Sequence, residues 1–162
     1  DGRIARTKKD RSHQQQSFGI QIDSLNDVLC FGALPSVAGY CAWSRWSDAP
    51  TPVWYGAALC VFTLAGLIRL AYFNVTETEG GGRKYYLGLP ITASALVFPL
   101  FYLLGLLLPG GPYILAAGML LLAALYVTPL CIPKPGLAAI CLLSAVGALE
   151  LAGLILAALG RL

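Results

Sequence analysis

Residues 17–43 read SFGIQIDSLNDVLCFGALPSVAGYCAW, an apolar run with two aspartates, Asp23 and Asp27, near its start. The run exceeds the roughly 20 residues with which a helix crosses the ~30 Å hydrocarbon layer of a bilayer. Pro35 should kink this helix, because proline cannot supply a backbone hydrogen-bond donor. Charged groups at a membrane boundary are costly unless they hold something. This segment therefore decides both the fold class and where to look for a site.

The composition of the whole chain fits a membrane protein. Its 162 residues are 57% hydrophobic and 12% charged, with a mean hydropathy of +0.71, whereas about a quarter of the residues of a soluble domain are charged. The apolar runs predict spans at 17–43, 53–73, 88–108, 113–130 and 136–160. We predict an all-α fold, a polytopic transmembrane helix bundle of about five full spans. Residues 1–162 would form one membrane-embedded domain, and residues 1–16 the end of an upstream helix followed by a surface loop.

The basic residues indicate the orientation. With residues 1–16 in the cytoplasm, most Lys and Arg lie on the cytoplasmic side, as the positive-inside rule requires. These are Arg3, Arg6, Lys8, Lys9, Arg11, Arg69, Arg83, Lys84 and Lys134. Only Arg45 and Arg161 would lie outside, together with an interfacial belt of Trp43, Trp46 and Trp54. A prokaryotic plasma membrane is the expected location, with the N-terminal acids facing the cytoplasm and no nucleic-acid partner.

The cysteines form no metal-binding motif. No two of them make a CxxC pair, and all fall in or beside apolar runs; they are Cys30, Cys41, Cys60, Cys131 and Cys141. Small buried core residues are the favoured interpretation, ahead of a zinc site.

The acidic residues form a more specific pattern. Gly19, Asp23 and Asp27 are spaced i, i+4, i+8 and so share one helical stripe, and Gly19 leaves room for another helix or a nucleotide. Upstream, Asp1 and Ala5 are also one turn apart, so two facing helices would gather three carboxylates. Clustered oxygen ligands are what hard divalent cations require. The alternative is that Asp23 and Asp27 merely solvate a helix end.

These residues carry a resemblance. Asp1-Gly2-x-x-Ala5-Arg6, followed by Gly19-x-x-x-Asp23-x-x-x-Asp27, resembles the signature of the CDP-alcohol phosphatidyltransferase family. Two further stretches resemble its phosphatidylserine synthase branch, and the resemblance covers about the first 95 residues. They are Asp23-Ser-Leu-Asn-Asp27 through Phe31-Gly32, and Arg69-Leu-Ala-Tyr-Phe-Asn74 followed by Gly88-Leu-Pro90.

The chain departs from the family signature in three places. The first of the family's four aspartates would lie three positions before Asp1, so we expect an N-terminally truncated domain. The spacer from Thr7 to Phe18 has twelve residues where the family usually has eight. Asn26 replaces the alanine more usual in the serine branch.

The resemblance implies transfer of a phosphatidyl group from CDP-diacylglycerol to an alcohol, with L-serine the preferred acceptor and CMP the leaving group. It also implies two divalent cations, Mg²⁺ or Mn²⁺. Asp1 would bind one cation, Asp23 both and Asp27 the second, with Asp27 also the general base. Paired metals would neutralise the diphosphate, and a carboxylate beside them can accept a hydroxyl proton.

The same resemblance assigns the remaining site residues. Gly2, Ala5 and Arg6 would contact the CDP-alcohol, with Gly19 beside them. Membrane lipids and a second copy of the chain, in a homodimer, are the other expected partners.

Arg69 and Glu150 are charged residues within apolar runs. Arg69 is the candidate for binding the acceptor, against the alternative of a charge that snorkels at a helix end. For Glu150 we expect hydrogen bonding at a helix or subunit interface.

Two alternatives stay open. The acceptor could instead be glycerol phosphate, inositol phosphate or another amino alcohol, and sequence separates these poorly. A cation or solute transporter could use Asp23 and Asp27 as an ion site, but it should carry polar or broken segments in several spans.

Overall fold

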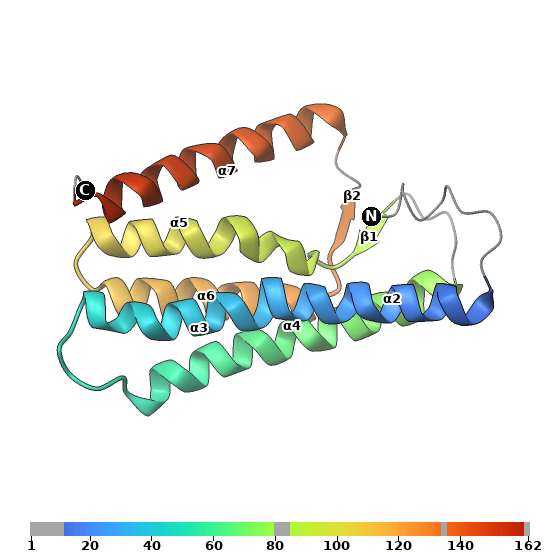
Figure 1. The fold of residues 1–162 in the computed structure, drawn as a ribbon, viewed down its shortest axis with the longest axis horizontal. Helices are drawn as coiled ribbons and strands as arrows, with labels where there is room; N and C mark the ends of the chain where they lie inside the picture. The colour runs from blue at the N-terminus through green and yellow to red at the C-terminus, as the bar shows by residue number, and fades with distance from the viewer. Residues whose placement is uncertain (1–11, 80–84, 134–135, 161–162) are drawn as a thin grey trace.

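Helices run side by side along the length of the molecule (Figure 1). The structure is a computed structural model, and it describes residues 12–79, 85–133 and 136–160. The first helical path is α2 (His13–Val28), a π-helical turn η1 (Leu29–Ala33), α3 (Leu34–Ala42) and a 3-10 turn η2 (Trp43–Arg45). It is followed by α4 (Val53–Glu79), a 3-10 turn η3 (Ile91–Ala93), α5 (Ser94–Leu107), α6 (Gly111–Val127) and α7 (Leu137–Ala158).

Each predicted span falls on one of these helical segments, so the predicted all-α bundle is confirmed. Within the described residues, Val53–Val75 and Leu137–Ala158 are long and apolar enough to cross a bilayer. Ile91–Leu107 and Gly111–Val127 are apolar but shorter. The 17 residues of α6 extend about 26 Å at 1.5 Å per residue, which is close to the hydrocarbon thickness.

The segment predicted as a loop from 74 to 86 contains more regular structure than expected. Helix α4 continues through Glu79, because residues 74–79 contain no glycine or proline that would end it. Strand β1 (Tyr85–Leu87) then pairs antiparallel with β2 (Cys131–Pro133), with Tyr86 opposite Ile132. This small sheet lies at the end of the bundle where α2 begins (Figure 1). Its strands are far apart in the chain, so no local pattern predicts their pairing.

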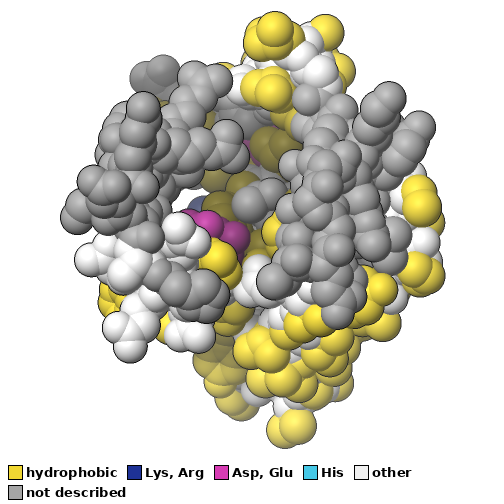
Figure 2. Space-filling view, turned by 90° about the vertical axis from the view of Figure 1, so that its right-hand side faces the viewer, with side chains coloured by type: hydrophobic (Ala, Val, Ile, Leu, Met, Phe, Trp, Pro, Cys, Tyr) yellow, Lys and Arg dark blue, Asp and Glu magenta, His cyan; other side chains and the backbone are white. Residues whose placement is uncertain are grey.

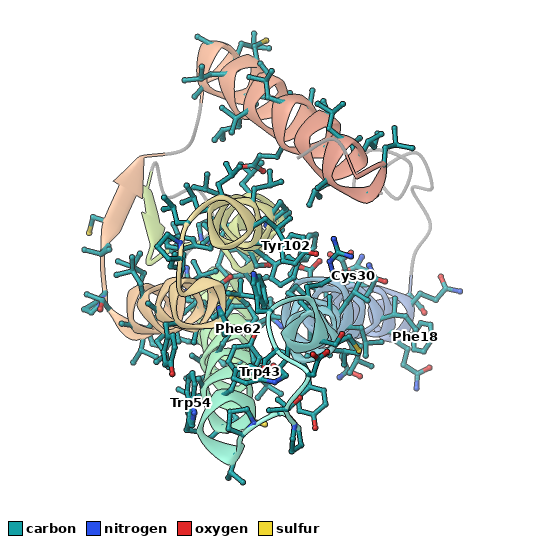
Figure 3. The ribbon with its side chains drawn as sticks, turned by 90° about the vertical axis from the view of Figure 1, so that its left-hand side faces the viewer. Phe18, Cys30, Trp43, Trp54, Phe62 and Tyr102 are labelled. Atoms are coloured by element: carbon teal, nitrogen blue, oxygen red, sulfur yellow. The ribbon has the colours of Figure 1, made fainter. Side chains whose placement is uncertain are left out.

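The core lies where α6 packs against α4 and α5. Its largest fully buried apolar side chains are Tyr55, Phe62, Leu115, Met119 and Leu122. Phe62 is central when the bundle is viewed along its helices (Figure 3). Two glycines permit the close approach of the helices. A Cβ on Gly118 would come within 2.3 Å of the Phe101 ring, and one on Gly111 within 2.4 Å of the Gly105 carbonyl oxygen.

The first helix departs from α-helical geometry just before Pro35, where we predicted a kink. The N–H that Pro35 lacks would normally bond the carbonyl of Phe31, four residues earlier. The chain widens into η1 just before this point, and the amide of Leu34 bonds Leu29, five residues back. The Phe31 carbonyl accepts instead from the hydroxyl of Ser94, at 2.7 Å. The carbonyl that lacks a donor because of Pro35 thus forms a hydrogen bond that links η1 to the start of α5.

Helix α7 packs against the bundle mainly through α5. Gly147 and Gly153 face Leu96 and Leu103 of α5, where a Cβ would come within 3.2 and 3.1 Å. Glu150, three residues from each glycine, is on the same side and only 7% exposed. Within the described residues its Oε2 atom has no hydrogen-bond partner, so the expected hydrogen bond is not observed at this atom.

The interpretation of the cysteines as buried core residues is wrong. All five are exposed and none forms a disulfide. An apolar run in a membrane protein turns one face to lipid, and a small apolar residue is as well suited there as in the core.

The tryptophans gather at one end of the bundle, opposite the small sheet. Trp43 and Trp54 lie at the end facing the viewer in Figure 3, with ring centroids 6.3 Å apart. The Trp54 ring stacks on Tyr113 at 5.2 Å, and the indole N–H of Trp46 donates to the Gly105 carbonyl at 2.9 Å.

Candidate active site

The two aspartates lie on α2, one helical turn apart. They occupy the half of α2 that leads into the π-helical turn. Asp23 is exposed and Asp27 is half-buried. Like charges at this spacing repel each other, so a cation between them would be stabilised. Figure 2 looks onto this end of the molecule, and acidic side chains are visible in a recess there.

Asp27 borders a cavity of about 310 Å³ between α2, α4 and η3. Arg69 lies on its α4 wall and Thr92 on its η3 wall. The full lining is Asp27, Arg69, Leu70, Phe73, Pro90, Ile91 and Thr92. A carboxylate, a guanidinium and a hydroxyl thus share one space with an apolar surface, which is the usual make-up of a small-molecule site.

Arg69 is held in place by the loop that follows β1. Its Nε–H donates to the Leu89 carbonyl at 2.9 Å and a terminal N–H donates to the Gly88 carbonyl at 3.1 Å. Its guanidinium carbon lies 5.7 Å from the centroid of the Phe73 ring, within reach of a cation–π interaction. Arg69 is 5% exposed, so it does not snorkel to water. Two of its five N–H groups bond the loop, and the side chain also lines the cavity that contains Asp27.

The Gly88-Leu-Pro90 stretch supplies the carbonyls to which Arg69 donates. Gly88 has φ +85°, a conformation that favours glycine, and a Cβ there would come within 3.0 Å of the Arg69 Nε atom. Its amide donates to the Leu130 carbonyl beside β2. Pro90 is extended and precedes η3. The stretch therefore turns the chain from the sheet into the wall of the cavity.

A second polar contact reaches the helix that carries the aspartates, and no local sequence pattern predicts it. The side-chain amide (Nδ2–H) of Asn74 on α4 donates to the Ser24 hydroxyl oxygen at 2.8 Å. The Ser24 hydroxyl in turn donates to the Ile20 carbonyl at 2.8 Å. Ser24 follows Asp23 directly. The only signal was that Asn74 ends a stretch resembling the serine branch.

The other predicted site residues are only partly described. Gly19 is on α2, and no described atom lies within 4 Å of a Cβ placed there, so this face of the helix is open. Asp1, Gly2, Ala5 and Arg6 lie outside the described residues. In residues 12–79, 85–133 and 136–160, no group of three or more His, Cys, Asp or Glu could hold a metal ion.

The geometry defines a helical membrane protein with a cavity at one end of its bundle that both Asp27 and Arg69 line. A family profile described as CDP-alcohol phosphatidyltransferase matches residues 1–130. The chain therefore belongs to the CDP-alcohol phosphatidyltransferase family, as its aspartate spacing indicated. Members of this family are integral to the membrane.

Curated relatives agree with this assignment. The chain is 36% identical over 104 residues to the CDP-diacylglycerol–serine O-phosphatidyltransferase of Helicobacter pylori, covering 64% of this chain and 40% of the relative. It is 36% identical over 105 residues to the archaetidylserine synthase of Methanothermobacter thermautotrophicus, covering 65% and 41%. It is 34% identical over 110 residues to the Saccharomyces cerevisiae CDP-diacylglycerol–serine O-phosphatidyltransferase, covering 63% and 36%. The matches thus span about two fifths of these relatives, and no solved structure matches the chain.

Proposed function

We propose that the protein transfers a phosphatidyl group from CDP-diacylglycerol to L-serine, giving phosphatidylserine and CMP. The carrying observation is that Asp27, one turn from Asp23, borders a cavity with Arg69 and Thr92. Family membership favours this reaction over a cation transporter. The relatives are a CDP-diacylglycerol–serine O-phosphatidyltransferase and an archaetidylserine synthase, which favours serine over glycerol phosphate or inositol phosphate as the acceptor.

Asp27 is the proposed general base. The hydroxyl of the acceptor enters the cavity and gives its proton to the Asp27 carboxylate. The freed oxygen attacks the phosphorus attached to diacylglycerol and forms a new P–O bond. The P–O bond to the cytidylyl phosphate breaks, and CMP leaves with that electron pair. A positioned base contributes about 10²- to 10⁴-fold to such a step.

Asp1, Asp23 and Asp27 are the proposed ligands of two divalent cations, Mg²⁺ or Mn²⁺. The two carboxylates of α2 fit this role in donor chemistry, because hard cations prefer oxygen. Without Asp1 they fall short of a full ligand set in the described residues. When bound, the cations neutralise the diphosphate charge.

The remaining residues would hold the two substrates. Gly2, Ala5, Arg6 and Gly19 are the proposed contacts of the CDP-alcohol, with Arg6 suited to a phosphate. Arg69 is the proposed contact of the acceptor carboxylate, since it lines the same cavity as Asp27.

The setting of the reaction is part of the proposal. The distribution of Lys and Arg supports a cytoplasmic active site in a prokaryotic plasma membrane. A homodimer is proposed on the resemblance to the family.

The test is CMP release by the purified full-length protein in lipid nanodiscs. We expect release from CDP-diacylglycerol with L-serine and Mg²⁺ or Mn²⁺, and none with EDTA. Parallel reactions with glycerol phosphate, inositol phosphate and other amino alcohols identify the acceptor. Absence of CMP with every acceptor would overturn the proposal, and metal-driven uptake into liposomes without nucleotide would favour the transporter instead.

A further inference from the structure

Helix α2 carries the two aspartates but is weakly held by apolar packing. None of residues 14–28 is buried. Its large apolar side chains point outward, with Phe18, Ile20, Ile22 and Leu25 all more than half exposed. A segment with few buried apolar contacts moves easily relative to the rest of a protein. The position of the aspartates must therefore depend on other contacts.

The hydrogen bond between Asn74 and Ser24 is one contact that can position the aspartates. The Asn74 amide donates to the Ser24 hydroxyl at 2.8 Å, and these residues are 50 positions apart in the chain. Ser24 lies between Asp23 and Asp27, so the bond is made within the turn that separates the two carboxylates. Holding the Ser24 hydroxyl fixes the rotation of α2 about its axis, and hence the direction of the aspartates.

The same helix, α4, holds the opposite wall of the cavity. Arg69 bonds the carbonyls of Gly88 and Leu89, which lead into η3. Arg69 and Asn74 are five residues apart, or about 7.5 Å along the helix axis. One short stretch of α4 thus bonds both the segment before Thr92 and the segment that carries Asp27, and it sets the spacing between them.

We propose that Asn74 is a positioning residue, which acts through Ser24 to fix the turn of α2 that carries Asp23 and Asp27 and so to keep Asp27 at the cavity. This inference rests on the proposed function, because it assigns the aspartates their role in catalysis. Asn74 touches no reacting atom in this account. Its effect comes through the orientation of the carboxylates that bind cations and accept the proton.

The test compares two isosteric replacements of Ser24 in the full-length protein. Ser24→Val removes the hydroxyl and Ser24→Thr keeps it, while both are β-branched and alter helix propensity alike. Partners that orient metal ligands typically contribute about 10- to 100-fold to activity or metal affinity. We expect Ser24→Val to lower kcat and raise the Mn²⁺ concentration for half-maximal rate within that range. Ser24→Thr should restore both to near the wild-type values.

Asn74→Leu, which keeps the side-chain shape without the donor, should lower kcat at least as much as Ser24→Val. The double variant should lose less than the two single losses combined, because both single changes remove the bond between Asn74 and Ser24. Ser17→Val, at a hydroxyl on the same helix with no hydrogen bond to another helix in the described structure, is the matched control and should leave the rate unchanged.

Hydrogen–deuterium exchange gives a readout that needs no turnover. Amides of residues 20–28 should exchange faster in Ser24→Val than in wild type or Ser24→Thr, without metal or substrate. Equal exchange and equal Mn²⁺ dependence in Ser24→Val and wild type would overturn the inference, as would equal damage in Ser24→Val and Ser24→Thr. A wild-type protein that releases no CMP would refute the proposed function instead, and the exchange comparison would still decide the role of Asn74.

Discussion

Helices α4 and α7 are both apolar enough to cross a membrane, but they take different places in the bundle. Val53–Val75 has a mean hydropathy of 1.8 in its most apolar window, and 39% of that window is buried inside the protein. Leu137–Ala158 is more apolar, at 2.3, yet only 6% is buried. The less hydrophobic helix is the central one. Hydropathy thus identifies a span but does not predict how far other helices surround it.

The polar residues of the two helices account for the difference. On α4, Tyr55 donates to the Gly39 carbonyl at 2.9 Å, and Thr63 lies 2.7 Å from the hydroxyl of Ser36. Arg69 and Asn74 continue this series toward the cavity. On α7 the one charged side chain, Glu150, has an oxygen with no partner among the described residues. Bonds to neighbouring helices make α4 the support of the site, whereas α7 packs mainly against α5.

The largest expected effect is at the acids beside α4. Asp27→Asn should lower CMP release by about 10²- to 10⁴-fold, because a carboxamide cannot act as the base. Binding of CDP-diacylglycerol, followed by calorimetry, should be largely kept. Asp48→Asn, at an exposed loop aspartate, is the control and should leave turnover intact. Retained activity in Asp27→Asn would remove Asp27 as the base.

The next effect concerns the packing around the central helices. Gly118→Ala would place a methyl group 2.3 Å from the Phe101 ring, so α5 and α6 must separate. Such overpacking costs about 1–3 kcal/mol, which thermal unfolding in detergent would detect. Gly136→Ala, before α7 and with nothing described within 4 Å, should leave the midpoint unchanged. Equal midpoints for the two variants would contradict the packing described.

A smaller effect should appear at Gly19. No described atom lies within 4 Å of a Cβ there, so Gly19→Ala should not weaken the fold. If the nucleotide approaches this face, the KM for CDP-diacylglycerol should rise by about tenfold, or ~1.4 kcal/mol, with little change in kcat. Gly56→Ala, where the nearest atom is 3.9 Å away, is the matched control. An unchanged KM in Gly19→Ala would exclude close contact with the nucleotide.

The smallest effect is expected on α7. Glu150→Gln removes a charge but keeps the shape, so thermal stability should change by no more than about 1 kcal/mol. Any gain would reflect the removed cost of a buried acid whose Oε2 atom has no partner among the described residues. The rate of CMP release should be unaffected. A loss of activity comparable to that of Asp27→Asn would show that α7 contributes to catalysis, and the contrast with α4 would fail.

The sequence predicted the helices and the acidic stripe because both depend on local spacing. Apolar runs locate spans, and Asp23 and Asp27 share a face in any helix. It did not predict the bonds from Arg69 to Gly88 and Leu89, which require the chain to return beside α4 after residue 80. The Asn74–Ser24 bond is equally non-local. The cysteines were misjudged because an apolar sequence does not distinguish a side facing lipid from one facing the core.

Pro35 and Ser94 form a coupled pair, although 59 positions separate them in the chain. Because Pro35 has no N–H, the Phe31 carbonyl lacks its usual backbone donor. The Ser94 hydroxyl donates a hydrogen bond to this carbonyl instead, at 2.7 Å. Replacing Ser94 alone by alanine should leave the Phe31 carbonyl without a donor and so lower the free energy of unfolding. Pro35→Ala restores a backbone N–H, so the same Ser94 replacement should then lower the unfolding free energy by less. The two positions should therefore vary together during evolution. A double-mutant cycle of unfolding free energies should give an interaction energy between them of about 0.5–3 kcal/mol, the range typical of coupled residues.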